Sequence, residues 1–406
     1  MRTLFVAFIL IASACSLVSC GKSGNSLVIA VNAGVEGSAL KAAAQQWAEQ
    51  KGIRAEVVEL PYANLFEKEL LDLTSHTGAY DVVMLDDPWF PRLAEHLEVL
   101  PKEPDGDFVK PALDVCRLPY KTGAYRALPY VGNSQVFFYR GDLFEKYKMG
   151  KPDTWQHVLE AAKKIGAGEK MYGYVMRAAP GNAVVADFMP LLWAFGGEMF
   201  DAAEMPALTK PEAIEALKFM IELGKYAPPG YTGFNADEVA AHLLQSTAVM
   251  SINWPAWIAA MDNPAKSNVV GKVEFAVMPS AKAPGVGELG SWLVAVPAGG
   301  KNKAAAFEFI HWATDPERQK EAAMRGNPPT RKSVFERQDL REKYRSYPVQ
   351  LKSLEGSRPR PRTAQWNEIE NAFGIYLSQA NSGSLTPEEA MQKAEAEIRQ
   401  ILARGR

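Results

Sequence analysis

Short apolar strands and amphipathic helices alternate between residues 27 and 85, and this alternation constrains the fold more than any other feature. Strands are expected at Leu27–Val31, Ala55–Leu60 and Asp81–Leu85, and helices at about Ser38–Gln50 and Tyr62–Thr74. A strand that returns through a helix lies parallel to its predecessor in the same sheet. The pattern therefore predicts an α/β fold whose parallel sheet is covered by helices on both faces.

Length and charge narrow the possibilities further. A chain of 406 residues is longer than one hydrophobic core usually organises, so two domains are expected. The formal net charge of −2 argues against a nucleic-acid partner, which would require a basic face. The Arg-rich segment Ser357–Arg362 is a local exception, and its two prolines favour a loop over a docking helix.

The N-terminus has the pattern of an export signal. Its apolar run, Leu4 to about Ala14, is shorter than the roughly 20 residues that cross a bilayer. Leu17–Cys20 resembles the lipobox of bacterial lipoproteins, in which the cysteine is acylated and becomes the new N-terminus. We therefore expect a lipoprotein signal peptide at 1–19, a lipid anchor on Cys20 and a tether over 20–26. The alternative is an ordinary secretion signal, and either one implies an extracytoplasmic protein.

Three further strands with tryptophans near their ends are expected between residues 247 and 299. They are Ala248–Ile252, Val273–Met278 and Trp292–Val296, each rich in apolar residues and bounded by Asn, Pro, Gly or Ser. At a strand end, the indole of Trp254 or Trp292 could stack on the C–H face of a polyhydroxylated ligand. This predicts a carbohydrate-binding cleft. The alternative, that Trp254, Trp257 and Trp292 all belong to a core, stays open because tryptophan is usually largely buried.

Polar residues follow the first three strands. In open parallel sheets, ligands bind beyond the carboxyl ends of the strands. Glu36, Pro61–Tyr62 and the segment Asp86–Trp89 are expected there, and the last combines two carboxylates with an indole. The alternative for Asp86 or Asp87 is that it caps a helix starting at Pro88.

The sequence contains no clear catalytic pattern. Gly285–Gly290 spells G-x-G-x-x-G but leads into a strand, whereas a dinucleotide site needs a helix there. Asp86 and Asp87 are consecutive and would point to opposite sides, although a distant glycosidase pair such as Asp87 with Glu288 stays open. The five histidines and Cys116 lack metal-ligand spacing. A binding protein without a metal or cofactor is therefore expected.

The order of several motifs resembles the solute-binding proteins (family 1) of bacterial ABC sugar importers, which include maltose-binding and polyol-binding lipoproteins. The resemblance spans nearly the whole mature chain. Its motifs are Asp81–Trp89, Pro129–Tyr139, Gln245–Pro279 with the sequence Asn-Trp-Pro, Gly290–Trp292, Ala304–Trp312 and Gly326–Val334.

This resemblance implies a two-lobed periplasmic-binding-protein fold of type II. Each lobe would have a mostly parallel sheet flanked by helices, and a hinge with several chain crossings would join them. The implied N-terminal lobe is 27–130 plus 290–334, and the implied C-terminal lobe is 131–289 plus 335–406. Closure of the lobes around a ligand would create the surface that the ABC permease recognises. A monomer is expected.

The resemblance also implies ligand-binding positions. Carried over to this sequence, they are Glu36, Asp86, Asp87, Trp89, Asn133, Trp254, Gly290, Trp292, Arg331 and Trp366. Trp254 and Asn133 depart from the maltodextrin binders, which favours a mono- or disaccharide or a polyol over a long oligosaccharide. The predicted function is capture of such a ligand and its delivery to the permease. Arg331 leaves open an anionic solute such as a sugar phosphate or uronate. A secreted carbohydrate-active enzyme using Asp87 or Glu288 is the other alternative.

Overall fold

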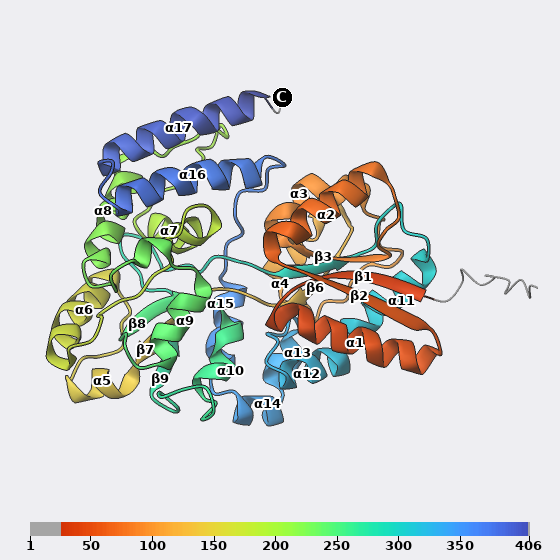
Figure 1. Ribbon diagram of the computed structural model, residues 1–406, viewed down its shortest axis with the longest axis horizontal. Helices are drawn as coiled ribbons and strands as arrows, with labels where there is room; N and C mark the ends of the chain where they lie inside the picture. The colour runs from red at the N-terminus through yellow and green to blue at the C-terminus, as the bar shows by residue number, and fades with distance from the viewer. Residues whose placement is uncertain (1–25, 405–406) are drawn as a thin grey trace, which may run out of the picture.

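The computed structural model describes residues 26–404, which form two lobes with separate hydrophobic cores (Figure 1). One core gathers apolar side chains from residues 27–131 and 289–354. The other gathers them from residues 136–278 and 366–401. The predicted signal peptide and lipid-anchor Cys20 lie outside the described residues.

The first lobe is built on a five-stranded sheet with the order β2-β1-β3-β10-β6. Its strands are β1 (Ser26–Asn32), β2 (Arg54–Leu60), β3 (Val82–Asp86), β6 (Leu128–Val131) and β10 (Trp292–Ala295). β1 pairs in parallel with β2 and β3, which confirms the parallel unit predicted from residues 27–85. β10 runs antiparallel between β3 and β6, because it arrives from the other lobe.

Helices cover both faces of this sheet (Figure 1). α2 (Tyr62–Ser75) and α3 (Phe90–Leu93) lie over one face, and α1 (Val35–Lys51) and α11 (Lys303–Ala313) lie over the other. The shorter elements of the lobe are η1 (Asp87–Trp89), η2 (Ala94–His96), α4 (Lys110–Asp114), β4 (Arg117–Leu118), β5 (Ala124–Tyr125), α12 (Pro316–Met324), α13 (Lys332–Glu336), α14 (Gln338–Lys343) and α15 (Tyr347–Glu355).

The second lobe packs helices around a small sheet with the order β8-β7-β9. The strands are β7 (Val136–Arg140), β8 (Met250–Asn253) and β9 (Val273–Ala276). The helices are α5 (Gly141–Lys146), α6 (Trp155–Glu169), α7 (Asn182–Ala194), α8 (Pro211–Gly224), η3 (Tyr231–Gly233), α9 (Ala236–Leu244), η4 (Pro255–Trp257), α10 (Ile258–Met261), α16 (Trp366–Asn381) and α17 (Pro387–Arg404). Within residues 26–404, no helix combines the length and hydropathy needed to span a membrane.

Two details differ from the sequence prediction. The named strands of the second lobe are not mostly parallel, because β7 enters directly from the first lobe and runs antiparallel to both neighbours. The segment from Phe335 to Leu354 also belongs to the first core rather than to the second lobe. There Phe335 packs edge-on against Tyr347 with ring centroids 5.2 Å apart. An amphipathic pattern shows that a helix has an apolar face but not which of two lobes that face contacts.

Three chain segments cross between the lobes and pair with one another. Gly290 N donates to Asn133 O at 3.0 Å, and Gln135 N donates to Glu288 O at 3.0 Å. On the other side of the middle segment, Leu289 N donates to Arg358 O at 2.8 Å. The hinge is therefore a short three-stranded ladder, and it brings residues near 133, 289 and 359 together between the lobes.

Candidate functional site

A cleft of about 590 Å³ lies between the lobes, and residues from both lobes and the hinge line it. The first lobe contributes the loop after β1, Tyr62 at the start of α2, and Asp86 at the end of β3. The second lobe contributes the starts of α7 and α9 and the turn after β8. Loops that are distant in sequence meet here because the strands that precede them end at the same sheet edge.

Aromatic side chains form the apolar part of the cleft. Trp254, Trp257, Trp292 and Tyr62 all line it. Trp292 is only 6% exposed and meets Tyr62 edge-to-face, with ring centroids 5.9 Å apart. Trp254 and Trp257 are half-buried, which leaves part of each indole accessible. These rings can cover the C–H face of a ligand.

The turn after β8 fixes the position of Trp254. Its backbone N–H donates to Asn253 Oδ1 at 2.8 Å, and Pro255 then starts η4. The indole lies against the backbone of Gly290, where an added Cβ would stand 2.7 Å from Cη2. The guanidinium of Arg177 lies 5.0 Å from the ring centroid of Trp254. Strand, hinge and cation together hold this indole at the cleft wall.

Acceptor oxygens dominate the polar part of the cleft. Tyr62 Oη donates to Asp86 Oδ2 at 2.7 Å, and Asn133 Nδ2 donates to Glu36 Oε1 at 3.3 Å. Two amide oxygens of the cleft, Asn32 Oδ1 and Asn133 Oδ1, are buried without a hydrogen-bond partner. Each is therefore available to a donor on a ligand.

The start of α9 adds two more carboxylates. Asn235 caps the helix, and its backbone N–H donates to Glu238 Oε2 at 2.8 Å. Asp237, in the same first turn, also lines the cleft. Acidic residues in a first turn stabilise the helix N-terminus, and this local preference turns both side chains toward the cleft.

Arg360 connects the two lobes at the floor of the cleft. Its side chain is 2% exposed and lies within 3.4–3.8 Å of four carboxylates, those of Asp86, Asp87, Glu288 and Glu370. Asp86 and Asp87 belong to the first lobe, Glu288 to the hinge and Glu370 to α16 of the second lobe. The guanidinium is therefore the shared counter-ion of an interlobe cluster.

Burial makes several of these carboxyl groups unusually basic. Burial raises the pKa of Asp87 to about 7 and the pKa of Glu288 to about 8, although Arg360 opposes both shifts. Burial also raises the pKa of Glu36 and of Glu370. Removal from water disfavours the charged form, and Arg360, with Arg362 at Asp87, opposes that effect only in part. The buried acids of the cluster therefore bind protons at a higher pH than free carboxyl groups do.

Two of the predicted site residues in the first lobe lie behind the cleft wall. Asp87 is fully buried and accepts from Arg362 Nη1 at 2.9 Å, so its carboxylate faces the hinge arginines. Trp89 is 1% exposed and packs against Trp292, with ring centroids 5.7 Å apart. Neither aspartate caps the turn at Pro88, because the side chain of Asp86 makes no capping hydrogen bond there. Trp89 supports the aromatic wall without lining it.

The other two predicted residues that lie away from the cleft are Arg331 and Trp366. Arg331 binds the first lobe, where Nε donates to Thr314 O and Nη1 pairs with Asp105 at 2.8 Å. Its guanidinium also stacks 3.9 Å from the ring centroid of Phe108. Trp366 is fully buried in the second core at the start of α16. A motif match gives the sequence position of a residue, but it does not show which side of a loop faces the ligand.

The structure places the remaining six predicted residues, Glu36, Asp86, Asn133, Trp254, Gly290 and Trp292, around the one cleft. It adds Asn182, Asp237, Glu238 and Arg360, which the sequence analysis did not single out, and it also places there Tyr62, which was expected at this sheet edge, and Trp257. The sequence feature that could have indicated Arg360 as a site residue is the Arg-rich segment Ser357–Arg362. Of the three arginines in this segment, only Arg360 lines the cleft, whereas Arg358 and Arg362 line a second cavity.

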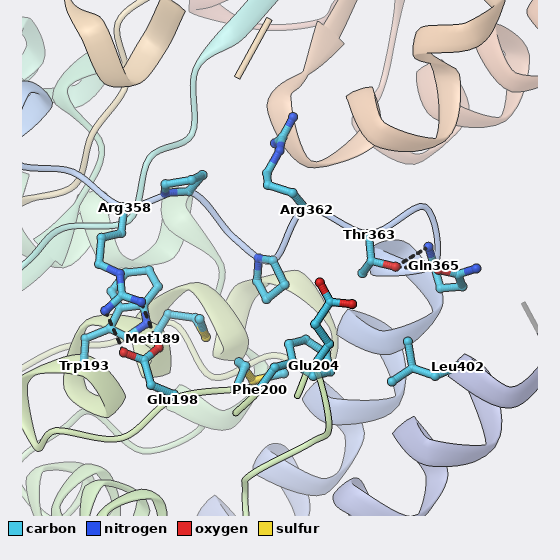
Figure 2. Close-up of a pocket in the computed structure, with 13 residues that line it drawn as sticks. Met189, Trp193, Glu198, Phe200, Glu204, Arg358, Arg362, Thr363, Gln365 and Leu402 are labelled. Atoms are coloured by element: carbon cyan, nitrogen blue, oxygen red, sulfur yellow. Dashed lines mark hydrogen bonds and ion pairs between the residues drawn. The ribbon is translucent and has the colours of Figure 1, made fainter. Parts of the chain in front are cut away.

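A second cavity, of about 480 Å³, lies against the other side of the segment at 358–365 (Figure 2). Arg358 pairs there with Glu198 at 2.8 Å and lies 4.7 Å from the ring centroid of Trp193. Arg362, from the same segment, pairs with Asp87 at 2.9 Å. Within residues 26–404, no group of three or more His, Cys, Asp or Glu side chains could hold a metal ion.

Comparisons with known proteins agree with this architecture. The family model described as bacterial extracellular solute-binding protein matches residues 33–320. A probable amino-acid ABC transporter periplasmic-binding protein of Sinorhizobium fredii is 25% identical over 403 residues, covering 94% of this chain and 90% of the relative.

Two solved structures match nearly the whole chain. An ABC transporter solute-binding protein from Agrobacterium radiobacter in complex with ribitol has a TM-score of 0.85 and 28% identity, covering 93% of this chain and 99% of that one. A maltose-bound protein of T. maritima has a TM-score of 0.86 and 27% identity, with the same coverage of both chains. The family model covers more than half of the sequence, and the two-lobed fold is shared across its length. The chain therefore belongs to the family of bacterial extracellular solute-binding proteins.

Proposed function

We propose that the protein captures a sugar or polyol of mono- or disaccharide size in the interlobe cleft and delivers it to an ABC permease. The observation that carries this proposal is the combination of accessible indoles with buried acceptor oxygens in one cleft. Indoles cover the C–H faces of such ligands, while carboxylate and amide oxygens accept from their hydroxyls. The related structures with ribitol and with maltose support this class of ligand.

The hinge supports capture by closure of the lobes. Its three paired segments are short, and the cleft residues lie on both sides of it. Rotation about such a hinge would change the distance between the two walls without disrupting either core. We propose that the closed, ligand-bound monomer is the form that the permease recognises.

The charges of the cleft argue against an anionic solute. Arg331, the residue on which that alternative rested, is bound to Asp105, Asp107 and Thr314 in the first lobe. Arg360 is the one cationic side chain among the described residues that line the cleft, and four carboxylates already surround it. The same argument disfavours an ordinary amino acid, the ligand class in the name of the Sinorhizobium relative, because an α-carboxylate needs an available cation.

The site also supports binding without catalysis. Asp87 and Glu288, the pair considered for glycoside hydrolysis, are both fully buried beside Arg360 and do not line the cleft. A general acid and a nucleophile must both reach the scissile bond. Incubation with aryl glycosides should therefore release no phenol, and turnover would overturn this part of the proposal.

We also propose that the chain is exported and held at a membrane through lipid on Cys20. The support is the sequence resemblance of Leu17–Cys20 to a lipobox. Labelling cells with an alkyne fatty acid should tag the protein, and Cys20→Ser should abolish the tag. Equal labelling of the variant would refute the anchor.

A thermal-shift screen against sugars and polyols tests the ligand proposal. A ligand at 100 times its dissociation constant adds about 2.7 kcal/mol to the native state, which raises the unfolding temperature. We expect a subset of pentitols, hexitols, monosaccharides and disaccharides to do so. A screen in which none of them shifts the midpoint would overturn the proposal.

A further inference from the structure

Carboxylates lie on both walls of the cleft and face one another across it. Glu36 belongs to the first turn of α1 in the first lobe, and Asp237 and Glu238 belong to the first turn of α9 in the second lobe. Glu36 and Asp237 therefore line the same cleft from different lobes. Asp86 adds a further carboxylate from the first lobe. Closing the lobes around a neutral guest would bring like charges together, and this repulsion opposes closure.

The hydrogen-bonding groups of the cleft are also unbalanced. Three of its side-chain donors are already engaged, since Tyr62 donates to Asp86, Asn133 donates to Glu36, and Asn182 donates to Glu370. In contrast, the oxygen Oδ1 of Asn133 is unpartnered although the residue is 97% buried. A hydroxyl group needs to accept as well as donate, whereas an ammonium group only donates. The free acceptors therefore match a donor-rich ligand better than a neutral one.

Local cations do not neutralise this surface. Arg360 is shared among four carboxylates, and Arg177 beside Trp254 is paired with Asp187 at 2.6 Å. The N-termini of α1, α7 and α9 each contribute roughly half a positive charge, about 1.5 in total, against the four carboxylates that line the cleft. The negative charge of the carboxylates in these first turns therefore exceeds the partial positive charge of the helix N-termini.

We infer that the preferred ligand is a carbohydrate or polyol that carries a primary ammonium group, held between Glu36 on one wall and Asp237 and Glu238 on the other. This inference rests on the proposed function and narrows its ligand class. A metal ion is the less suitable cation, because the described residues contain no metal-binding group of three or more side chains. The accessible indoles of Trp254 and Trp257 add a cation–π surface for the same ammonium group.

Isothermal titration with matched pairs of ligands tests the inference. The pairs are glucose with glucosamine, galactose with galactosamine, mannose with mannosamine, and sorbitol with glucamine, at pH 7. Each N-acetylated amino sugar keeps the size but lacks the charge. In at least one pair we expect the amine to bind at least tenfold more tightly than both its hydroxyl parent and any N-acetyl form, equivalent to about 1.4 kcal/mol.

Charge-removing variants then locate the ammonium group. Glu36→Gln and Asp237→Asn should each reduce the ratio of amine to parent affinity at least threefold. Glu67→Gln removes an exposed carboxylate from α2 outside the cleft and should leave the ratio unchanged. If every neutral parent binds as tightly as its amine, the inference fails while the proposed function stands. An amine preference that neither cleft variant reduces would also overturn it. If no member of the panel binds while a pentitol or disaccharide shifts the unfolding temperature, the inference fails and the proposed function stands.

Discussion

The indole of Trp254 lies so close to the backbone of Gly290 that a Cβ at residue 290 would stand 2.7 Å from Cη2. Contacts this short between non-bonded carbons are repulsive, so one of the two groups must move if a side chain is added. Trp254 comes from the second lobe and Gly290 from the hinge, where its N–H donates to Asn133 O. The hinge backbone thereby sets where this indole stands in the cleft.

Gly290→Ala should therefore impair binding with little loss of stability. The new methyl group meets the outer edge of an indole, which can swing toward solvent, so the fold adapts while the aromatic wall is disrupted. We expect at least a tenfold loss of affinity for whichever ligand the screen identifies, measured by titration calorimetry. Gly106→Ala is the control, because a Cβ there meets no atom within 4 Å. Unchanged affinity in Gly290→Ala would mean that the position of Trp254 is unimportant.

Trp254 and Trp366 provide a test that separates a ligand-binding tryptophan from a core tryptophan. Trp254→Ala removes a half-buried ring from the cleft and should reduce affinity at least about 30-fold, equivalent to about 2 kcal/mol. Trp366→Ala removes a fully buried ring and should cost about 3–5 kcal/mol of stability. Urea unfolding and titration on both variants measure the two effects. A Trp254→Ala protein with full affinity would remove this residue from the site.

The sequence predicted the scaffold of the site better than its side-chain composition. Strand and helix alternation located β1, α1, β2, α2 and β3, and hence the sheet edge where Glu36 and Asp86 lie. These predictions succeeded because hydrophobic periodicity reports directly which backbone segments are buried. The strands at Trp292 and before Trp254 followed from the same signal.

The predicted site residues that do not line the cleft differ from the others in the direction in which their side chains face. Asp86 and Asp87 are neighbours in the sequence, yet only Asp86 reaches the cleft. An indole such as that of Trp89 or Trp366 could stack on a ligand, but packing against other aromatic and apolar groups buries both side chains. Arg360 was missed because its role requires carboxylates that are distant in the chain, since Glu288 is 72 positions away and Asp86 is 274 positions away. No local pattern carries that information.

Arg331→Ala tests whether this arginine has any part in ligand recognition. Its guanidinium joins Asp105, Asp107 and Thr314 O within the first lobe, so its loss should cost about 2 kcal/mol of stability. Ligand affinity should be unchanged, because Arg331 does not line the cleft. Urea unfolding and titration calorimetry measure the two quantities. A marked loss of affinity without loss of stability would restore the anionic-ligand alternative.

Glu288 should make the stability of the protein depend on pH. Burial raises its pKa to about 8, from about 4.5 in an unfolded chain, so the folded state holds an extra proton between these pH values. Stability from this group is fully present below pH 4.5 and is lost as the pH rises toward 8. One such proton changes the free energy of unfolding by up to about 1.4 kcal/mol per pH unit.

Glu288→Gln should flatten this dependence, because the amide keeps the shape of the protonated acid and cannot ionise. Urea unfolding at pH 5, 6.5 and 8 measures the slope at constant ionic strength. Part of the slope should remain in the variant, since burial also raises the pKa of Asp87 to about 7. Glu67→Gln, on the exposed face of α2, should retain the full slope of the unmodified protein. If Glu288→Gln retained it as well, the Glu288 carboxyl would have to be ionised beside Arg360 throughout this range, and burial would not be raising its pKa.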